Sequence, residues 1–95
     1  MGNPPYYFTP SGQHQTDTTL SAAQGLVIPA GTTYVLIQAL GANVRYRLDG
    51  VDPTASTGFQ LKAGNPPVRI PVLTGMTIRV IQESSGASIE YQCIG

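Results

Sequence analysis

The sequence predicts an all-β domain, a small β-sandwich or jelly-roll-like barrel preceded by an extended N-terminal arm. Three observations support this prediction. β-Branched and aromatic residues recur in short alternating runs, whereas apolar residues at helical spacing are hard to find. The eleven glycines and eight prolines are spread along the chain, as expected of turns between strands. Runs of roughly five to seven residues recur at intervals of about ten residues, which is typical of sandwiches and barrels.

The strand pattern differs from segment to segment. Residues 33–40 form a mostly apolar run that suits a central strand buried on both faces. In residues 44–48, apolar and charged side chains alternate, as in a strand with one face in the core, and Phe59 and Leu61 alternate with Gln60 and Lys62 in the same way. Pro71 cannot donate a backbone hydrogen bond, so its strand is expected at a sheet edge or in a bulge. The predicted strands cover residues 25–28, 33–40, 44–48, 59–62, 68–72, 76–82 and 87–93.

Turn residues separate these segments. The sequence ESSG at residues 83–86 lies between the last two strands and predicts a β-hairpin that joins them. A longer loop, residues 50–58, interrupts the regular spacing. Its turn signals are Asp49-Gly50 and Asp52-Pro53, and we expect both aspartate side chains to bond to the backbone ahead of them.

The chain is electrically neutral and poor in charge. It holds five Lys or Arg and five Asp or Glu among 95 residues, whereas about a quarter of the residues are charged in an average domain. Because net charge helps to keep a monomer soluble and unassociated, this composition favours a subunit of an assembly. We expect a homo-oligomer, with a trimer favoured, or a monomer that becomes fully ordered only on its capsid. The single cysteine, Cys93, excludes an internal disulfide and fits synthesis in a reducing cytoplasm, and no signal peptide or membrane segment is visible.

The N-terminal residues 1–18 differ from the single domain predicted for residues 19–95. Tyr6, Tyr7 and Phe8 are adjacent to one another and lie between prolines. Proline keeps a segment extended and reduces the entropy lost when it becomes ordered. Three adjacent aromatic rings are costly to leave in water. We therefore expect this arm to dock on its own sandwich or on a neighbouring subunit, with a loose terminus as the alternative.

Few residues suit catalysis or metal binding. His14 and Asp17 together provide fewer ligands than a closed metal site requires, and Asp49 and Asp52 fall short of the oxygen ligands of a Ca²⁺ site. Cys93 alternates with apolar residues and is expected to be buried. Phosphate-binding, nucleophile-elbow and metalloprotease motifs are absent from the sequence. We predict no catalytic, cofactor-binding or metal-binding residue, and we do not expect an enzyme.

Nucleic-acid binding is also not expected. Arg45 and Arg47 share one face of a predicted strand, and Lys62, Arg69 and Arg79 can join them only if their strands are neighbours. Phosphate binding needs a positive field, and the acidic residues cancel the basic ones. Because a guanidinium is planar and weakly hydrated, these arginines suit a protein interface.

Two segments resemble small structural proteins of tailed bacteriophages. Residues 46–58 read YRLDGVDPTASTG, and that family shares the Tyr-Arg pair, the Asp-Gly turn and the following Pro-Thr-Ala and Gly. Residues 78–82 (IRVIQ) and 86–89 (GASI) resemble the end of such proteins. The resemblance covers about half of the chain and implies a virion component with a small β-sandwich fold. It implies no catalytic residue, and the arm lies outside it.

The resemblance and the composition together predict a capsid decoration or cement protein that binds the major capsid protein or other virion subunits. A head–tail, tail-ring or fibre subunit is the nearest alternative. A carbohydrate- or receptor-binding module is the alternative from another class, because such sandwiches stack sugars on exposed aromatic rings. The candidate interaction residues are Tyr6, Tyr7, Phe8, Arg45, Arg47, Asp49, Asp52 and Pro53.

Overall fold

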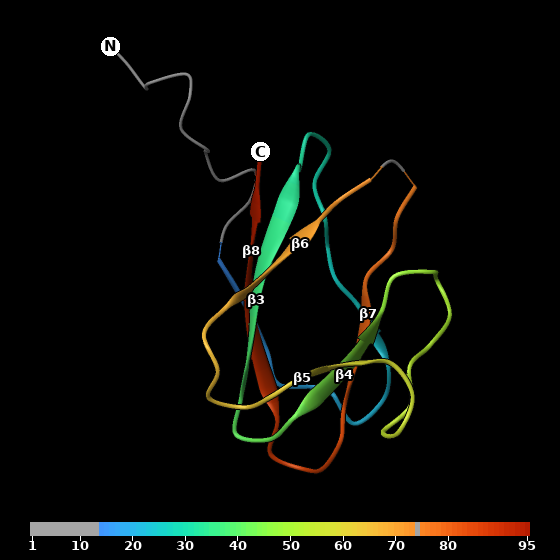
Figure 1. Ribbon diagram of the computed structural model, residues 1–95, viewed down its shortest axis with the longest axis vertical. Coiled ribbons are helices and arrows are strands. Elements are labelled where there is room, and N and C mark those ends of the chain that lie inside the picture. Colours follow the sequence, from blue (N-terminus) through green and yellow to red (C-terminus); the bar gives the residue numbers. More distant parts are fainter. Residues whose placement is uncertain (1–13, 74) are drawn as a thin grey trace.

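The protein is a sandwich of two four-stranded antiparallel sheets (Figure 1). The computed structural model describes residues 14–73 and 75–95, and this part of the chain contains no helix, so none that could cross a membrane. The all-β prediction is thus confirmed. The strands are β1 (Gln15–Asp17), β2 (Gln24–Gly25), β3 (Tyr34–Leu40), β4 (Val44–Arg47), β5 (Phe59–Leu61), β6 (Val68–Pro71), β7 (Arg79–Gln82) and β8 (Ser88–Ile94).

The strand order is that of a jelly roll. The first sheet has the order β1-β8-β3-β6 and the second the order β2-β7-β4-β5. Each of the first four strands therefore pairs with its counterpart from the other end of the chain, β1 with β8, β2 with β7, β3 with β6 and β4 with β5. Such a chain is a long two-stranded ribbon rolled so that successive pairs lie in alternate sheets. The tip of the ribbon is the loop at residues 48–58, which joins β4 to β5.

The core lies between the two sheets. On β3, Val35, Ile37 and Ala39 point inward and are almost fully buried, as are Val44 on β4 and Val80 on β7. Because side chains alternate along a strand, the residues between them point away from the core. The predicted alternation in residues 44–48 is confirmed. The buried cluster comprises Leu20, Leu26, Val35, Ile37, Ala39, Val44, Leu61, Ile70, Ile78, Val80, Ala87, Ile89, Tyr91 and Cys93.

The predicted hairpin at residues 83–86 is wrong. β7 pairs with β2 and β4, whereas β8 pairs with β1 and β3, so the turn crosses from one sheet to the other. It packs against the second crossing turn, residues 41–43, and Glu83 N–H donates to Asn43 O at 2.9 Å. Gly41 has φ +80°, and a Cβ at this position would lie 2.2 Å from Gly86 O. The two crossings thus meet backbone to backbone, which only glycine permits here.

Three further strand predictions need adjustment. β3 is central as predicted, but its burial alternates, so it is not covered on both faces along its whole length. The first predicted strand is reduced to β2, although Leu26 N–H still donates to Ile78 O at 2.9 Å. β7 begins only at Arg79. The expectation for Pro71 is confirmed, because β6 is an edge strand that pairs only with β3.

Candidate functional site

Arginines from two neighbouring strands line the outer face of the second sheet. Arg45 and Arg47 alternate with inward-pointing Val44 and Tyr46 on β4, and Arg79 of β7 lies directly opposite Arg47. Arg79 therefore lies on the same face as the two β4 arginines, because β4 and β7 are neighbours. Arg69 lies on the first sheet, away from this group. Three guanidinium groups on one face would repel one another unless acidic groups intervened.

Arg45 on β4 bonds to the turn at residues 83–86 and to the ribbon-tip loop. Its Nε donates to Glu83 Oε2 at 2.6 Å, and its Nη1 donates to Gly58 O at 2.9 Å. Gln60 Nε2 on β5 donates to the same Glu83 oxygen at 2.7 Å. One carboxylate in the cross-sheet turn thus accepts from β4 and β5, while the same guanidinium holds the end of the ribbon-tip loop. Hydrogen bonds that involve ionised groups are stronger than those between neutral groups.

The other two arginines fix the beginning of the ribbon-tip loop. Arg47 forms a two-point pair with Asp49, with Nε–Oδ1 at 3.1 Å and Nη2–Oδ2 at 2.5 Å. Asp49 Oδ1 also accepts from Val51 N–H at 3.3 Å, which confirms the predicted turn bond. Asp52 instead accepts from Arg79 Nε. Each arginine on this face is therefore matched by an acidic partner within the chain.

Short-range contacts complete the loop. The Pro53 ring is buried, and Gly58 lies close to both Pro53 and Arg45, since a Cβ on Gly58 would be 3.3 Å and 3.4 Å from their Cβ atoms. At the tip, Thr54 and Thr57 exchange backbone hydrogen bonds of 3.0 and 3.2 Å. The loop is thus folded against the outer face of its own sheet. The candidate interaction residues of this region are therefore already engaged within the chain. They are Arg45, Arg47, Asp49, Asp52 and Pro53.

The ion pairs shift the acidity of their carboxyl groups. The hydrogen bond from Arg47 lowers the pKa of Asp49. The pKa of Glu83 is lowered by the bond from Gln60 and then by Arg45. On the first sheet, His14 and then Thr16 lower the pKa of Glu90, whose Oε1 lies 2.6 Å from His14 Nε2. Hydrogen bonds to the charged form favour ionisation, so these carboxylates stay charged at neutral pH.

A pocket opens where the ribbon-tip loop leaves β4 and returns to β5. It has a volume of about 540 Å³ and is lined by residues 47–49 on one side and 57–59 on the other. Phe59 is 63% exposed, although it occupies an inward-pointing position opposite Tyr46. The two rings are 5.5 Å apart and tilted by 40°. Among the described strands, β5 is an edge strand that pairs with β4 alone, which leaves Phe59 with a cross-strand neighbour on one side.

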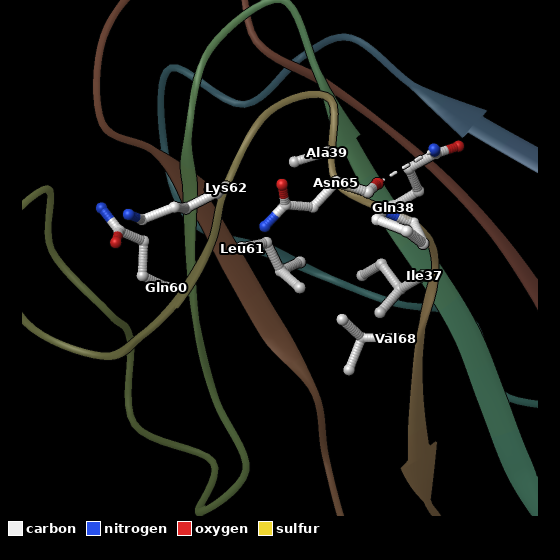
Figure 2. Close-up of a pocket in the computed structure, with 9 residues that line it drawn as sticks. Ile37, Gln38, Ala39, Gln60, Leu61, Lys62, Asn65 and Val68 are labelled. Atoms are coloured by element: carbon white, nitrogen blue, oxygen red, sulfur yellow. Dashed lines mark hydrogen bonds between the residues drawn. The ribbon is translucent and has the colours of Figure 1, made fainter.

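A second, smaller pocket lies where the edges of the two sheets meet (Figure 2). It has a volume of about 250 Å³ and a floor of Ile37, Leu61 and Val68. In Figure 2, Lys62 and Gln60 point away from this floor. Gln38 Nε2 donates to Asn65 O at 3.1 Å across the loop that joins β5 to β6. We interpret this pocket as the seam between two edge strands, since no charged group is directed into it.

The outer face of the first sheet has a different character. By the strand register, Thr16, Gln38 and Glu90 form one row across the face, and Leu36 and Gln92 belong to the next. Glu90 is paired with His14. Arg69 stacks over the ring of buried Tyr34, with its guanidinium carbon 4.0 Å from the ring centroid. Most side chains on this face are therefore uncharged hydrogen-bonding or apolar groups.

The remaining predicted residues fall in two places. Cys93 is buried in the core, as predicted, and burial raises the pKa of its thiol. Tyr6, Tyr7 and Phe8 lie outside the described residues. Among residues 14–73 and 75–95, no three His, Cys, Asp or Glu side chains are grouped as a metal site would need. Within the same ranges, no buried side-chain nitrogen or oxygen lacks a hydrogen-bond partner.

Comparison with protein-family models, with curated proteins and with solved structures gave no match to this chain.

Sequence reasoning did not identify two residues of the loop region. Glu83 was assigned only to a turn, although it is the acceptor for Arg45 and Gln60. Phe59 was assigned to the core by alternation, although most of its side chain is exposed. The edge position of β5 decides the exposure of Phe59, and strand order cannot be obtained from a pattern of period two.

Proposed function

We propose that this chain is a structural protein of a bacteriophage virion, a decoration or cement protein that binds the assembled head. The observation that carries the proposal is the pairing of charges on a neutral jelly roll whose ribbon-tip loop bears the phage-like sequence at residues 46–58. Jelly rolls serve in viral capsids and in lectins, which is an analogy at the level of the fold and not a functional site.

The outer face of the first sheet is the proposed surface for the particle. The arginines on the outer face of the second sheet are paired with its own loop and turn, whereas the first sheet offers Leu36, Gln38 and Thr16 around the internal His14–Glu90 pair. Arg69 lies on this face as well, stacked over the ring of Tyr34. Uncharged groups can be buried against a partner without the desolvation cost of an unpaired charge. β1, which belongs to residues 1–18, lies at the edge of this sheet. The major capsid protein is the proposed partner.

Particles that lack the protein provide the test. Binding only to the assembled lattice stabilises that lattice by mass action. We therefore expect heads without the protein to assemble but to release DNA at lower temperature, measured with a DNA-binding dye during a temperature ramp. Adding purified protein back should restore the release temperature. If heads without the protein retain DNA normally yet fail to attach tails, a head–tail or tail role replaces the decoration role. Loss of adsorption alone would favour a receptor-binding role.

The contribution of the arm can be tested separately. Deletion of residues 1–13 leaves every described strand intact, because β1 begins at Gln15. We expect the shortened protein to keep its thermal stability and to bind heads more weakly, since docked aromatic side chains contribute about 1.5–3 kcal/mol each. Light scattering reports the oligomeric state of both proteins, with a trimer expected for the full chain. Unchanged binding after the deletion would show that the arm is not part of the contact.

A further inference from the structure

We propose that the pocket between residues 47–49 and 57–59 binds an uncharged carbohydrate. This inference goes beyond the structural role proposed above and does not depend on it. The pocket belongs to the second sheet and its loop. A protein that attaches through its first sheet would therefore present this pocket to the surroundings of the particle.

Phe59 provides the apolar platform. The tilted Tyr46 ring packs beside it and supports it, and Phe59 is 63% exposed. A supported ring loses little conformational freedom when a ligand stacks on it. Sugar rings carry patches of C–H groups that pack on such a surface. An exposed aromatic ring in a pocket of about 540 Å³ fits the usual volume range of small-molecule sites, about 300–1,000 Å³.

Arg47 and Asp49 line the same pocket as Phe59, although Arg47 belongs to the outer face of the sheet and Phe59 to the inner face. Their pair provides adjacent donors and acceptors. Arg47 uses Nε and Nη2 to bond both oxygens of Asp49, and a guanidinium has further N–H groups to donate. A carboxylate likewise has more lone pairs than these bonds occupy. A donor beside an acceptor matches two neighbouring hydroxyl groups, because each hydroxyl both donates and accepts. The two-point pair holds these groups in place before a ligand arrives.

The charge of the pocket selects the ligand class. Arg47 and Asp49 are the charged members of its lining, and they neutralise each other. The remaining lining residues are Leu48, Thr57, Gly58 and Phe59. A phosphate, a carboxylate or an amine would have to compete with this internal pair for its partner. An uncharged polyol can instead bond to the outer side of the pair without breaking it, and this points to neutral sugars.

The test is an oligosaccharide array probed with the full-length protein. The array carries neutral glucose-, galactose-, mannose- and N-acetylglucosamine-type oligosaccharides together with sialylated and sulfated forms. We expect binding to neutral members, with a dissociation constant of about 1 mM for a single small site. Hits are then titrated in solution by NMR. The amide signals of residues 47–49 and 57–59 should shift, whereas those of Gln38 and Gln92 on the first sheet should not.

Variants identify the residues responsible. We expect F59A to weaken binding at least about tenfold, and V27A, a matched loss of an exposed apolar side chain, to change it less than about twofold. We expect D49N to weaken binding of neutral sugars and to permit binding of sulfated ones, because Arg47 then lacks its counter-charge. D17N is the matched control, since Asp17 bonds to Thr19 and lies outside the pocket lining. Absence of binding to every neutral oligosaccharide, or F59A binding like the parent protein, would overturn the proposal.

Discussion

The outer faces of the two sheets differ in how their polar side chains are paired. On the second sheet, Arg45 and Arg79 hold the ribbon-tip loop against the strands, and their acidic partners lie within the same chain. On the first sheet, half-buried Leu36 and Gln38 lie near the hydrogen bond between His14 and Glu90, and Arg69 lies opposite Leu36. The arginines of the second face are thus paired within the chain, whereas most side chains on the first face are uncharged. Substitutions on the two faces should therefore affect different measurements.

The largest effect on stability is expected from G58A. Gly58 has φ +134°, and its Cβ would lie 2.9 Å from Tyr46 O and 3.3 Å from Pro53. The alanine must either strain the backbone or lift the loop from the sheet. We expect a loss of about 2–4 kcal/mol in the free energy of unfolding, measured by chemical denaturation. G50A in the same loop is the control, because Gly50 has φ +80° with no atom within 4 Å of its Cβ. Equal losses for the two variants would show that close packing at Gly58 is unimportant.

R45M should be the next most destabilising change. It removes the bonds to Glu83 and Gly58 while it keeps an apolar stem of similar length. We expect a loss of about 1–2 kcal/mol, together with faster amide hydrogen exchange in residues 48–58. R45K tests the geometry of the guanidinium, since an ammonium cannot make the same forked contacts. If R45M unfolds like the parent protein, Arg45 does not fasten the loop.

Acid should reduce the stability that the ion pairs of the second sheet contribute to the fold. The pKa values of Glu83 and Asp49 are lowered in the folded protein, so their pairs stabilise the fold above the ordinary pKa values of about 4. Their contribution declines as the pH falls from there through the lower pKa values of the folded state. We expect the melting temperature to fall over this range. E83Q should show a smaller decline than the parent protein, and an identical pH profile would contradict the assigned role of Glu83.

L36E should have the smallest effect on stability and a large effect on attachment. Leu36 points outward from β3 and is half-buried. We expect a loss of no more than about 1 kcal/mol in the free energy of unfolding, but at least about tenfold weaker binding to heads, because the new carboxylate, even when it pairs with Arg69 on the neighbouring strand, would lose its hydration in the contact. L36Q separates charge from shape and should bind more tightly than L36E. Normal head binding by L36E would remove the first sheet from the proposed contact.

The sequence predicted which side of a strand faces the core better than it predicted the neighbours of that strand. Alternation placed Val44 and Leu61 inward, and the missing N–H of Pro71 placed β6 at an edge. The ESSG turn was misassigned because a short Gly-containing connection serves equally well within one sheet or between two. The partnership of Arg45 with Glu83 spans 38 residues. Only the rolled ribbon brings these two side chains together, and no local pattern reports it.

Cryo-electron microscopy of the intact particle tests the central claim most directly. The account predicts that the outer face of β1-β8-β3-β6 contacts the capsid subunit, with Leu36 and Gln38 in the interface. It also predicts that the ribbon-tip loop stays folded on the second sheet, with Arg45 and Arg79 still bound to Glu83 and Asp52. Density that places the loop against the capsid and leaves the first sheet in solvent would contradict the account.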